Sequence, residues 1–233
     1  MALSSHQLRL QDGKTVIAIN VGGRNPDVMQ VLGQAGAHVA FIDCERTGIG
    51  LDSATELIRA ARIAGLCSVV RSWSKDPAVL VQYLDRQADG LVVPHINNAQ
   101  DAADVVELVR YACGPKAQDK TVIVQIETVE AVANLDSIMA VPGVNAYLIG
   151  PNDLAYSMTG QRGGKTPDVL EAVERVSKTL HAAGKRFGMP ADWSQLENFQ
   201  NIGATFLYFP IEWLLTKALK DLSIGLKIDE KLS

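Results

Sequence analysis

Two short segments of the sequence combine an apolar run with an acidic residue, a pattern that could place a metal ion. They are V-Q-I-E-T at positions 124–128 and I-G-P-N-D-L at positions 149–154. Glu127 and Asp153 are 26 positions apart, about one β-α repeat, so both are predicted at the C-terminal ends of neighbouring parallel strands. Two carboxylates there suit Mg²⁺ or Mn²⁺, which typically keeps further sites for water and substrate. Alternatively, Glu127 caps a helix that starts near Val129, and Asp153 is a solvated loop residue.

Short apolar runs alternate with helical patterns along the whole chain. The predicted strands are Thr15–Asn20, His38–Asp43, Cys67–Arg71, Gly90–Val93, Thr121–Ile126, Asn145–Ile149, Arg186–Met189 and Thr205–Phe209. The predicted helices are Pro26–Gln34, Asp52–Ile63, Pro77–Arg86, Ala99–Tyr111, Val129–Met139, Pro167–Ala183, Ser194–Asn201 and Ile211–Leu222. Eight strands alternating with eight helices predict a closed (β/α)8 TIM barrel, with a doubly wound open sheet as the alternative. No linker interrupts residues 1–233, so one domain is expected.

On this map, polar residues follow the strand ends at one rim. Asp43, Glu45 and Arg46 follow the second strand, Arg71 ends the third, and His95 follows the fourth. Together with the two carboxylates above, they predict a site at that rim. Two simpler interpretations stay open: Asp43 and Arg71 could form a salt bridge that closes the barrel top, and His95 is favoured as an ordinary rim histidine over a catalytic one.

Composition narrows the classes of function. The chain has 233 residues, 47% of them hydrophobic and 21% charged, and a formal charge of −4, so no basic field attracts nucleic acid. No apolar stretch reaches the length of a membrane span, and residues 1–11 lack the apolar region of a signal peptide. Cys44, Cys67 and Cys113 are odd in number and form no C-x-x-C motif. A cytoplasmic protein without a membrane or nucleic-acid partner is expected.

Several motifs resemble one known family. V-Q-I-E-T, the following A-V-A-N-L-D-S-I and the later G-V-N-A-Y-L-I-G-P-N-D-L are similar to segments of the metal-dependent class II pyruvate aldolases, the HpcH/HpaI aldolase family. So are A-G-A-H-V-A-F-I-D-C-E, S-V-V-R ending at Arg71, and Y-L-D-R-Q-A-D-G-L-V-V-P around Asp85. The resemblance covers nearly the whole chain. It implies a barrel of the phosphoenolpyruvate/pyruvate-domain type, assembled as a homo-oligomer (trimer or hexamer), with the helix at about 211–222 exchanged between subunits.

The resemblance also implies roles for individual residues. Glu127 and Asp153 would bind Mg²⁺, Mn²⁺ or Co²⁺, and Arg71 would hold an α-keto acid and stabilise its enolate. Backbone N–H groups of the Pro151–Asp153 stretch would receive the substrate carboxylate, so Gly150, Pro151, Asn152 and Gln125 join the substrate-binding candidates. This division of labour agrees with the chemistry, because a divalent cation and a guanidinium both stabilise the negative charge of an enolate.

Two departures from the family pattern stand out. The family usually has D-x-E-H after the second strand, and its histidine, paired with an aspartate that matches Asp85, handles protons through water. Here the histidine position is Arg46, which cannot act as a general base near pH 7. Asp85 has then lost its partner or pairs with Arg46. The segment Ala112–Lys120 is also shorter than the family's, in which it helps to wall the substrate pocket.

Three hypotheses follow. The first is a metal-dependent lyase acting on a pyruvate- or oxaloacetate-derived enolate, with Arg46, Arg71 and Asp85 as catalytic candidates. Decarboxylation of oxaloacetate needs no base at Arg46. The second is a condensing enzyme similar to the aldolase-fold citrate synthases, in which the enolate attacks an acyl thioester. The third is a metabolite-binding protein without turnover. Arg46 itself is expected to bind a substrate's distal carboxylate at the pocket mouth, or to form a surface salt bridge with Glu45 or Asp85.

Overall fold

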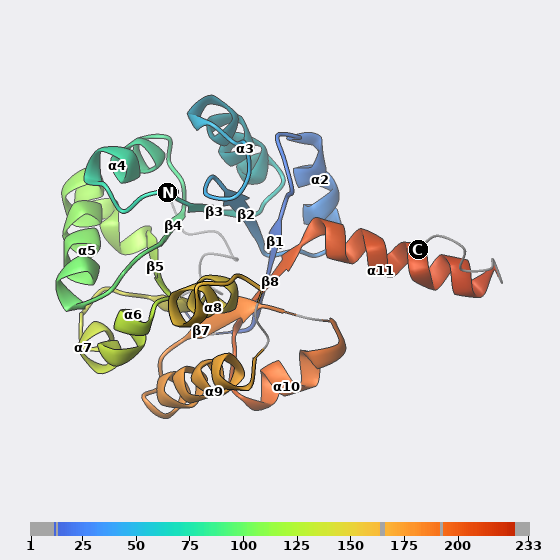
Figure 1. The fold of residues 1–233 in the computed structure, drawn as a ribbon. Coiled ribbons are helices and arrows are strands. Elements are labelled where there is room, and N and C mark those ends of the chain that lie inside the picture. Colours follow the sequence, from blue (N-terminus) through green and yellow to red (C-terminus); the bar gives the residue numbers. More distant parts are fainter. Residues whose placement is uncertain (1–11, 13, 164–165, 192, 227–233) are drawn as a thin grey trace.

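Eight parallel strands form a closed barrel in the computed structural model, which describes residues 12, 14–163, 166–191 and 193–226 (Figure 1). The strands are β1 (Val16–Asn20), β2 (Val39–Asp43), β3 (Cys67–Arg71), β4 (Gly90–Val93), β5 (Thr121–Ile126), β6 (Ala146–Ile149), β7 (Phe187–Pro190) and β8 (Phe206–Pro210). Each pairs with its neighbours in chain order, and β8 closes the ring against β1, with Ala18 opposite Tyr208. The predicted TIM barrel is therefore confirmed, and the open sheet is excluded.

Helices follow the strands, and all but the last of them surround the barrel. They are α2 (Asp27–Gln34), α3 (Leu51–Ile63), α4 (Pro77–Asp85), α5 (Ala99–Cys113), α6 (Val129–Ala133), α7 (Leu135–Met139), α8 (Pro151–Thr159), α9 (Pro167–Ala182), α10 (Leu196–Asn201) and α11 (Ile211–Gly225). Two short 3-10 helices, η1 (Gly114–Asp119) and η2 (Trp193–Gln195), complete the described elements. Two differences from expectation concern the site: α8 was not among the predicted helices, and the helix predicted over 129–139 is divided at Asn134 into α6 and α7.

The strands are buried on both faces, as a barrel requires. In β2, Val39 and Phe41 belong to the cluster that fills the barrel interior, whereas Ala40 and Ile42 belong to the cluster between strands and helices. This alternation arises because successive side chains of a strand point to opposite faces. Two apolar layers thus hold the strand ends in fixed register, which gives the rim side chains a rigid support.

Close packing of strands explains one glycine. A Cβ added at Gly188 of β7 would lie 1.7 Å from the carbonyl oxygen of Phe206 in β8. Only hydrogen fits at this point, so glycine lets β7 and β8 approach closely enough to pair.

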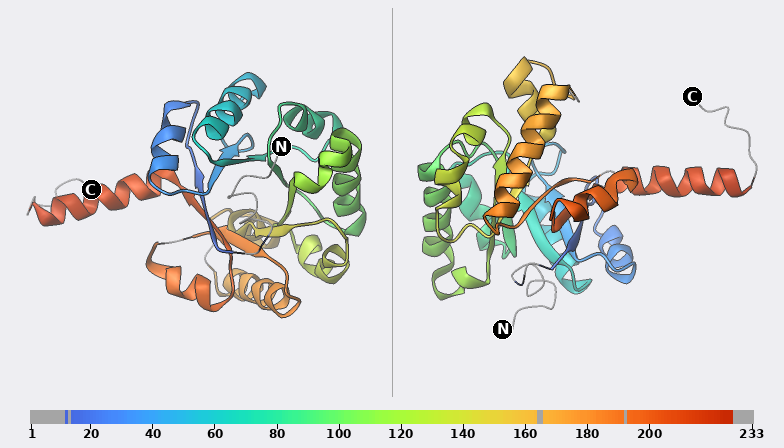
Figure 2. Two further views of the ribbon diagram at one scale, coloured as in Figure 1. Left: turned by 180° about the vertical axis from the view of Figure 1, so that it is seen from behind. Right: turned by 90° about the horizontal axis from the view of Figure 1, so that it is seen from below.

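The last helix leaves the barrel instead of covering it. In Figures 1 and 2, α11 extends outward from the end of β8. None of its residues is buried, and its large apolar side chains Trp213, Leu215, Leu219, Leu222 and Ile224 are each at least half exposed. Among the residues that the structure describes, no helix is long and apolar enough to span a membrane.

Candidate active site at the carboxyl rim of the barrel

The charged residues that follow β2, β3, β5 and β6 meet at the carboxyl rim. Glu45 lies among them, since the charged groups near enough to act on its carboxylate are Arg71, Glu127, Arg46 and Asp153. Burial is the largest effect on this carboxylate, and it raises the pKa of Glu45. These groups come from positions up to 108 residues apart, between Glu45 and Asp153. The barrel topology thus brings together the carboxylates and arginines that the sequence placed at separate strand ends.

Glu127 is held rigidly at the end of β5. Its side chain is 1% exposed, and Oε1 accepts the backbone N–H of His95 at 2.8 Å. The amide of Gln125 donates to Oε2. A Cβ added at Gly150 would lie 3.0 Å from Cβ of Glu127 and 3.1 Å from Oε2, so glycine makes room for the carboxylate. Since Thr128, not Glu127, caps α6 by accepting the N–H of Ala131 at 3.0 Å, the alternative role of Glu127 as a cap does not hold.

Asp153 lies in the first turn of α8, directly after β6. Its side chain is 18% exposed, so it is not the solvated loop residue of the alternative interpretation. Oδ1 accepts a hydrogen bond from Nη2 of Arg46 at 2.6 Å, and Nη2 of Arg162 lies 3.4 Å from the same oxygen. Gly150, Pro151 and Asn152 form the start of the helix, whose N-terminal backbone groups favour anions.

Arg71 is oriented by two acidic partners. Nη2 donates to Oδ2 of Asp43 at 2.5 Å and Nε donates to Oδ1 at 2.9 Å, a bidentate pair. Nε also lies 3.3 Å from Oε2 of Glu45. Burial alone would lower the pKa of Arg71, but the hydrogen bonds and charge of Asp43 and the charge of Glu45 raise it, so the side chain stays cationic. The salt bridge between Asp43 and Arg71 is present, and it fixes the guanidinium at the wall of the rim cavity.

Asp85 is the one catalytic candidate that the fold does not bring to this rim. It is the last residue of α4, which runs antiparallel to the strands and ends where β4 begins. Its charge acts on Cys113 at the end of α5, where burial is the main cause of the raised thiol pKa. Arg46 instead pairs with Asp153 at 2.6 Å and with Glu45 at 3.3 Å, so within the described part of one chain the expected contact between Arg46 and Asp85 is absent.

Arg46, Arg71 and Asp153 of the rim border a cavity of about 430 Å³. It is bordered by Arg46, Arg71, Asn152, Asp153, Arg162, Gly163, Pro190, Tyr208, Pro210 and Trp213. Sequence reasoning did not select Tyr208 or Arg162. Asn20 was not selected either, although it ends β1 and donates to the Tyr208 hydroxyl at 2.7 Å. The rule that found Arg71, a polar residue at a strand end, would also have found Asn20; Arg162 lies in a loop and carries no such signal.

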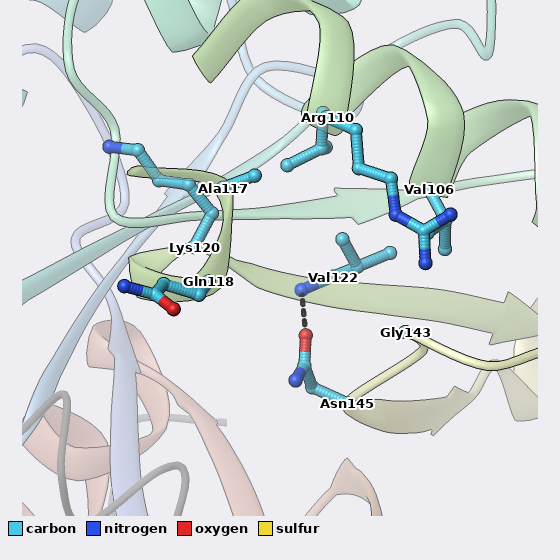
Figure 3. A pocket seen from close by; sticks show the side chains of 9 residues that line it. Val106, Arg110, Ala117, Gln118, Lys120, Val122, Gly143 and Asn145 are labelled. Carbon is cyan, nitrogen blue, oxygen red and sulfur yellow. Dashed lines mark hydrogen bonds between the residues drawn. The ribbon is translucent and has the colours of Figure 1, made fainter. Parts of the chain in front are cut away.

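A second hollow lies at the opposite end of the barrel, where the strands start (Figure 3). It has a volume of about 280 Å³, and Arg110, Gln118, Lys120 and Asn145 are among its lining residues. Asn145 accepts the backbone N–H of Val122 at 2.7 Å there. The short segment Ala112–Lys120 runs beside this hollow through η1, and none of its residues is among those that line the rim cavity.

The donor set of the rim fits a divalent ion of the magnesium type. In the described ranges, no three His, Cys, Asp or Glu side chains surround a point that could hold an ion, so no cage made of protein alone is present. Glu127 and Asp153 offer hard oxygens, and Mg²⁺ and Mn²⁺ typically complete such a pair with water and substrate. Two further buried oxygens, Oε2 of Glu45 and Oε1 of Gln125, have no hydrogen-bond partner among the described residues, which leaves acceptors for such water.

The barrel and its rim define a class of protein: a β/α barrel with paired carboxylates and fixed arginines where barrel enzymes carry their active sites. Residues 17–209 match the HpcH/HpaI aldolase/citrate lyase family, and the chain belongs to this family.

Known proteins similar to this chain include aldolases and a citrate synthase. It is 29% identical to the hydroxypyruvate/pyruvate aldolase of Pseudomonas aeruginosa, over 92% of this chain and 90% of that protein. It is 28% identical to the 4-hydroxy-2-oxo-heptane-1,7-dioate aldolase of Salmonella newport, over 96% and 95% of the two chains. Among solved structures, an HpcH/HpaI aldolase/citrate lyase family protein from Burkholderia cenocepacia has a TM-score of 0.84 at 26% identity, covering 95% of this chain and 99% of that one. The citrate synthase SbnG has a TM-score of 0.84 at 25% identity, covering 97% and 98%.

Proposed function

We propose that the protein is a metal-dependent carbon–carbon lyase that acts on a pyruvate- or oxaloacetate-derived enolate and cleaves or forms a hydroxy-oxo acid. The observation that carries this proposal is the meeting of Glu127, Asp153 and the oriented guanidinium of Arg71 at one rim. Membership of an aldolase family and similarity to named aldolases over most of the chain support it. A cytoplasmic location belongs to the same proposal.

Glu127 and Asp153 are the proposed ligands of Mg²⁺ or Mn²⁺, with Co²⁺ as a further candidate. The bound ion would supply Lewis-acid stabilisation of negative charge on the substrate oxygens. Gln125 and Gly150 support Glu127, the first by a hydrogen bond and the second by leaving space. Such supporting contacts orient a ligand and typically change metal affinity 10–100-fold when removed.

Arg71 is the proposed binding group for the keto acid and for the enolate oxygen. Asp43 and Glu45 engage its Nε and Nη2, and among the described residues no hydrogen bond or ion pair uses Nη1. A guanidinium fixed in this way stabilises developing charge without having to reorient during the reaction. The start of α8, Pro151–Asp153, supports binding of the substrate carboxylate, because the first N–H groups of a helix have no partner within the helix.

Arg46 restricts the class of reaction that we expect. It cannot remove a proton near pH 7, so aldol cleavage, which deprotonates a hydroxyl group, has no base at this position. Decarboxylation of oxaloacetate does not need a base. The bond to the distal carboxylate breaks, CO₂ leaves, and the electron pair of the broken bond forms the enolate of pyruvate. Water then protonates the carbon atom of this enolate. We therefore expect decarboxylation to be favoured over aldol cleavage.

Arg46 and Arg162 supply positive charge where a distal carboxylate would lie. Both line the rim cavity together with Arg71, and their side chains are 34% and 58% exposed, so a ligand can reach them. A guanidinium binds a carboxylate through two parallel hydrogen bonds when geometry permits. We propose that Arg46 recognises the second carboxylate of a dicarboxylic keto acid.

A condensing enzyme is the second candidate. The similarity to the citrate synthase SbnG is as high, by TM-score, as that to the family protein from Burkholderia cenocepacia. In a citrate-forming enzyme, a base other than Arg46 would remove a proton from the acyl group of the thioester, the resulting enolate would attack the keto carbon of oxaloacetate, and water would then release the thiol. The sites of both candidates share Glu127, Asp153 and Arg71, so product analysis must separate them.

We propose that the protein is a homo-oligomer, a trimer or hexamer, in which α11 packs on another subunit. The exposed apolar side chains of α11 support this, since none of the residues that the structure describes covers them and a second subunit could bury them. Analytical ultracentrifugation of the wild type and of Leu219→Glu tests this assembly; a monomeric wild type would contradict it.

Product analysis tests the function. Purified protein with Mn²⁺ is assayed against oxaloacetate, against hydroxy-oxo acids, and against oxaloacetate with acetyl-CoA. We expect release of pyruvate and CO₂ from oxaloacetate; citrate formation would favour the condensing enzyme, and no turnover would leave only metabolite binding. Arg46→His then tests the role of Arg46. A general base typically contributes 10²–10⁴-fold, so restored aldol cleavage would identify the missing base, whereas a fall in native activity supports anion binding.

A further inference from the structure

We infer that Arg46 is an internal cation that competes with the divalent ion for Asp153, so that the ion and an anionic substrate bind interdependently. This inference rests on the proposed metal site and adds a role for Arg46 in loading it. It applies to a residue at which the chain departs from the family pattern.

The contact between Arg46 and Asp153 is the first observation. Nη2 of Arg46 donates to Oδ1 of Asp153 at 2.6 Å, a short charge-assisted hydrogen bond between the β2 loop and the first turn of α8. The same Nη2 lies 3.3 Å from Oε1 of Glu45. Arg162 approaches the same Oδ1 of Asp153 at 3.4 Å. The carboxylate proposed to bind the ion is therefore already held through Oδ1 by one guanidinium and approached by a second.

The charge balance of the rim is the second observation. Asp43, Glu45, Glu127 and Asp153 carry four negative charges, and Arg46, Arg71 and Arg162 carry three positive ones. With the arginine, the cluster has a net charge of −1; with a neutral histidine at position 46, it would have −2, which matches a divalent ion. Arg46 thus removes half of the charge that would attract the ion.

Binding of the ion changes this balance. With a divalent ion at Asp153, the net charge of −1 would become +1, and the positive charge of the ion would repel the guanidinium that holds Oδ1 of the same carboxylate. The released guanidinium lies in the cavity that Arg71 and Asp153 also line, so the anion of the substrate can take the place of Asp153 as its partner. A dicarboxylic keto acid offers one carboxylate to Arg71 and a second one to the released guanidinium. Each ligand therefore raises the affinity for the other, as linkage requires.

Mn²⁺ titrations measure this coupling directly. The signal of free Mn²⁺ in electron paramagnetic resonance gives its affinity for the wild type with and without saturating 2-oxoglutarate, a dicarboxylic keto acid. We expect 2-oxoglutarate to tighten Mn²⁺ binding by about 10-fold or more, within the usual range of such couplings. Arg46→Gln should bind Mn²⁺ about 10-fold more tightly than the wild type without 2-oxoglutarate, and 2-oxoglutarate should then tighten Mn²⁺ binding less than it does in the wild type. Arg46→Lys keeps the charge and should stay close to the wild type.

Two controls separate the possible failures. Arg175→Gln, on the exposed side of α9, should leave the Mn²⁺ affinity unchanged. Glu127→Gln should abolish Mn²⁺ binding if the proposed metal site is right. If Glu127→Gln abolishes binding but Arg46→Gln does not tighten it, or if 2-oxoglutarate tightens Mn²⁺ binding equally in the wild type and in Arg46→Gln, the inference is overturned while the metal site stands. If Glu127→Gln binds Mn²⁺ like the wild type, both fail.

Discussion

Arg71→Lys tests whether the oriented guanidinium matters more to catalysis than to the fold. Lysine keeps the positive charge but loses the planar fork that holds Asp43 through Nε and Nη2 at 2.9 and 2.5 Å. A lysine can replace one of these two hydrogen bonds. Asp43, which is buried, would keep a cation nearby but lose one charge-assisted hydrogen bond.

The two costs have different sizes. One lost hydrogen bond to a charged group lowers the free energy of unfolding by about 1.5–3 kcal/mol. With a urea m-value of about 3 kcal/mol/M, the midpoint of unfolding falls by about 0.5–1 M. Loss of a positioned donor to developing negative charge typically costs about 10²–10³-fold in turnover, about 2.7–4 kcal/mol. We therefore expect a folded variant whose catalytic loss exceeds its loss of stability.

Steady-state kinetics with oxaloacetate and urea unfolding, on the same preparation, measure both quantities. Arg175→Lys, an exposed arginine on α9, is the matched control and should change neither. The reasoning would be refuted if kcat/KM of Arg71→Lys stayed within threefold of the wild-type value while the midpoint of unfolding fell. Arg71 would then serve only the salt bridge with Asp43.

Three further predictions concern residues around the site and in the barrel. Gly150→Ala should weaken Mn²⁺ binding about 10-fold, because the Cβ of the new alanine crowds Glu127, and an unchanged binding isotherm contradicts this. The melting temperature should change little, because alanine accepts the backbone φ of −103°. Tyr147→Phe should leave the free energy of unfolding unchanged or raise it by about 1 kcal/mol, because the buried hydroxyl, whose pKa burial raises to about 12, has no partner among the described residues; a clear loss of stability in urea argues against it. Burial raises the pKa of Glu45, so above the ordinary glutamate pKa of 4.5 the folded state keeps a proton that the unfolded state releases. The free energy of unfolding should therefore fall as the pH rises above 4.5. Glu45→Gln should reduce this fall, measured by urea titrations between pH 4 and about 7.

Much of the barrel could be predicted because its strands are short apolar runs buried on both faces. β3, β4 and β5 have the predicted bounds, Cys67–Arg71, Gly90–Val93 and Thr121–Ile126. The start of α4 at Pro77 was predicted as well, and Asp76 caps this helix by accepting the N–H of Ala78 at 2.7 Å. The start of α3 differs by one residue from the predicted Asp52, since the helix begins at Leu51 after Gly50.

The site was predictable as a rim but not as a set of contacts. Carboxylates that follow consecutive apolar runs at the spacing of one β-α repeat are expected at the same rim, and for this reason Glu127 and Asp153 could be selected together. The partner of Arg46 could not, because Asp153 is 107 positions away and the choice among Glu45, Asp85 and Asp153 depends on how the β2 loop packs against α8. That helix was itself missed, since Pro151 and Asn152 resemble a turn more than the start of a helix.

The central claim is that Glu127 and Asp153 bind a divalent ion that works with Arg71 on an α-keto acid. The most direct test is the initial rate of oxaloacetate decarboxylation at one fixed Mn²⁺ concentration, for the wild type, for Glu127→Gln and without protein. We predict a saturable rate for the wild type that is well above the rate with Mn²⁺ alone, and a Glu127→Gln rate equal to that of Mn²⁺ alone. A Glu127→Gln rate equal to that of the wild type would contradict the account.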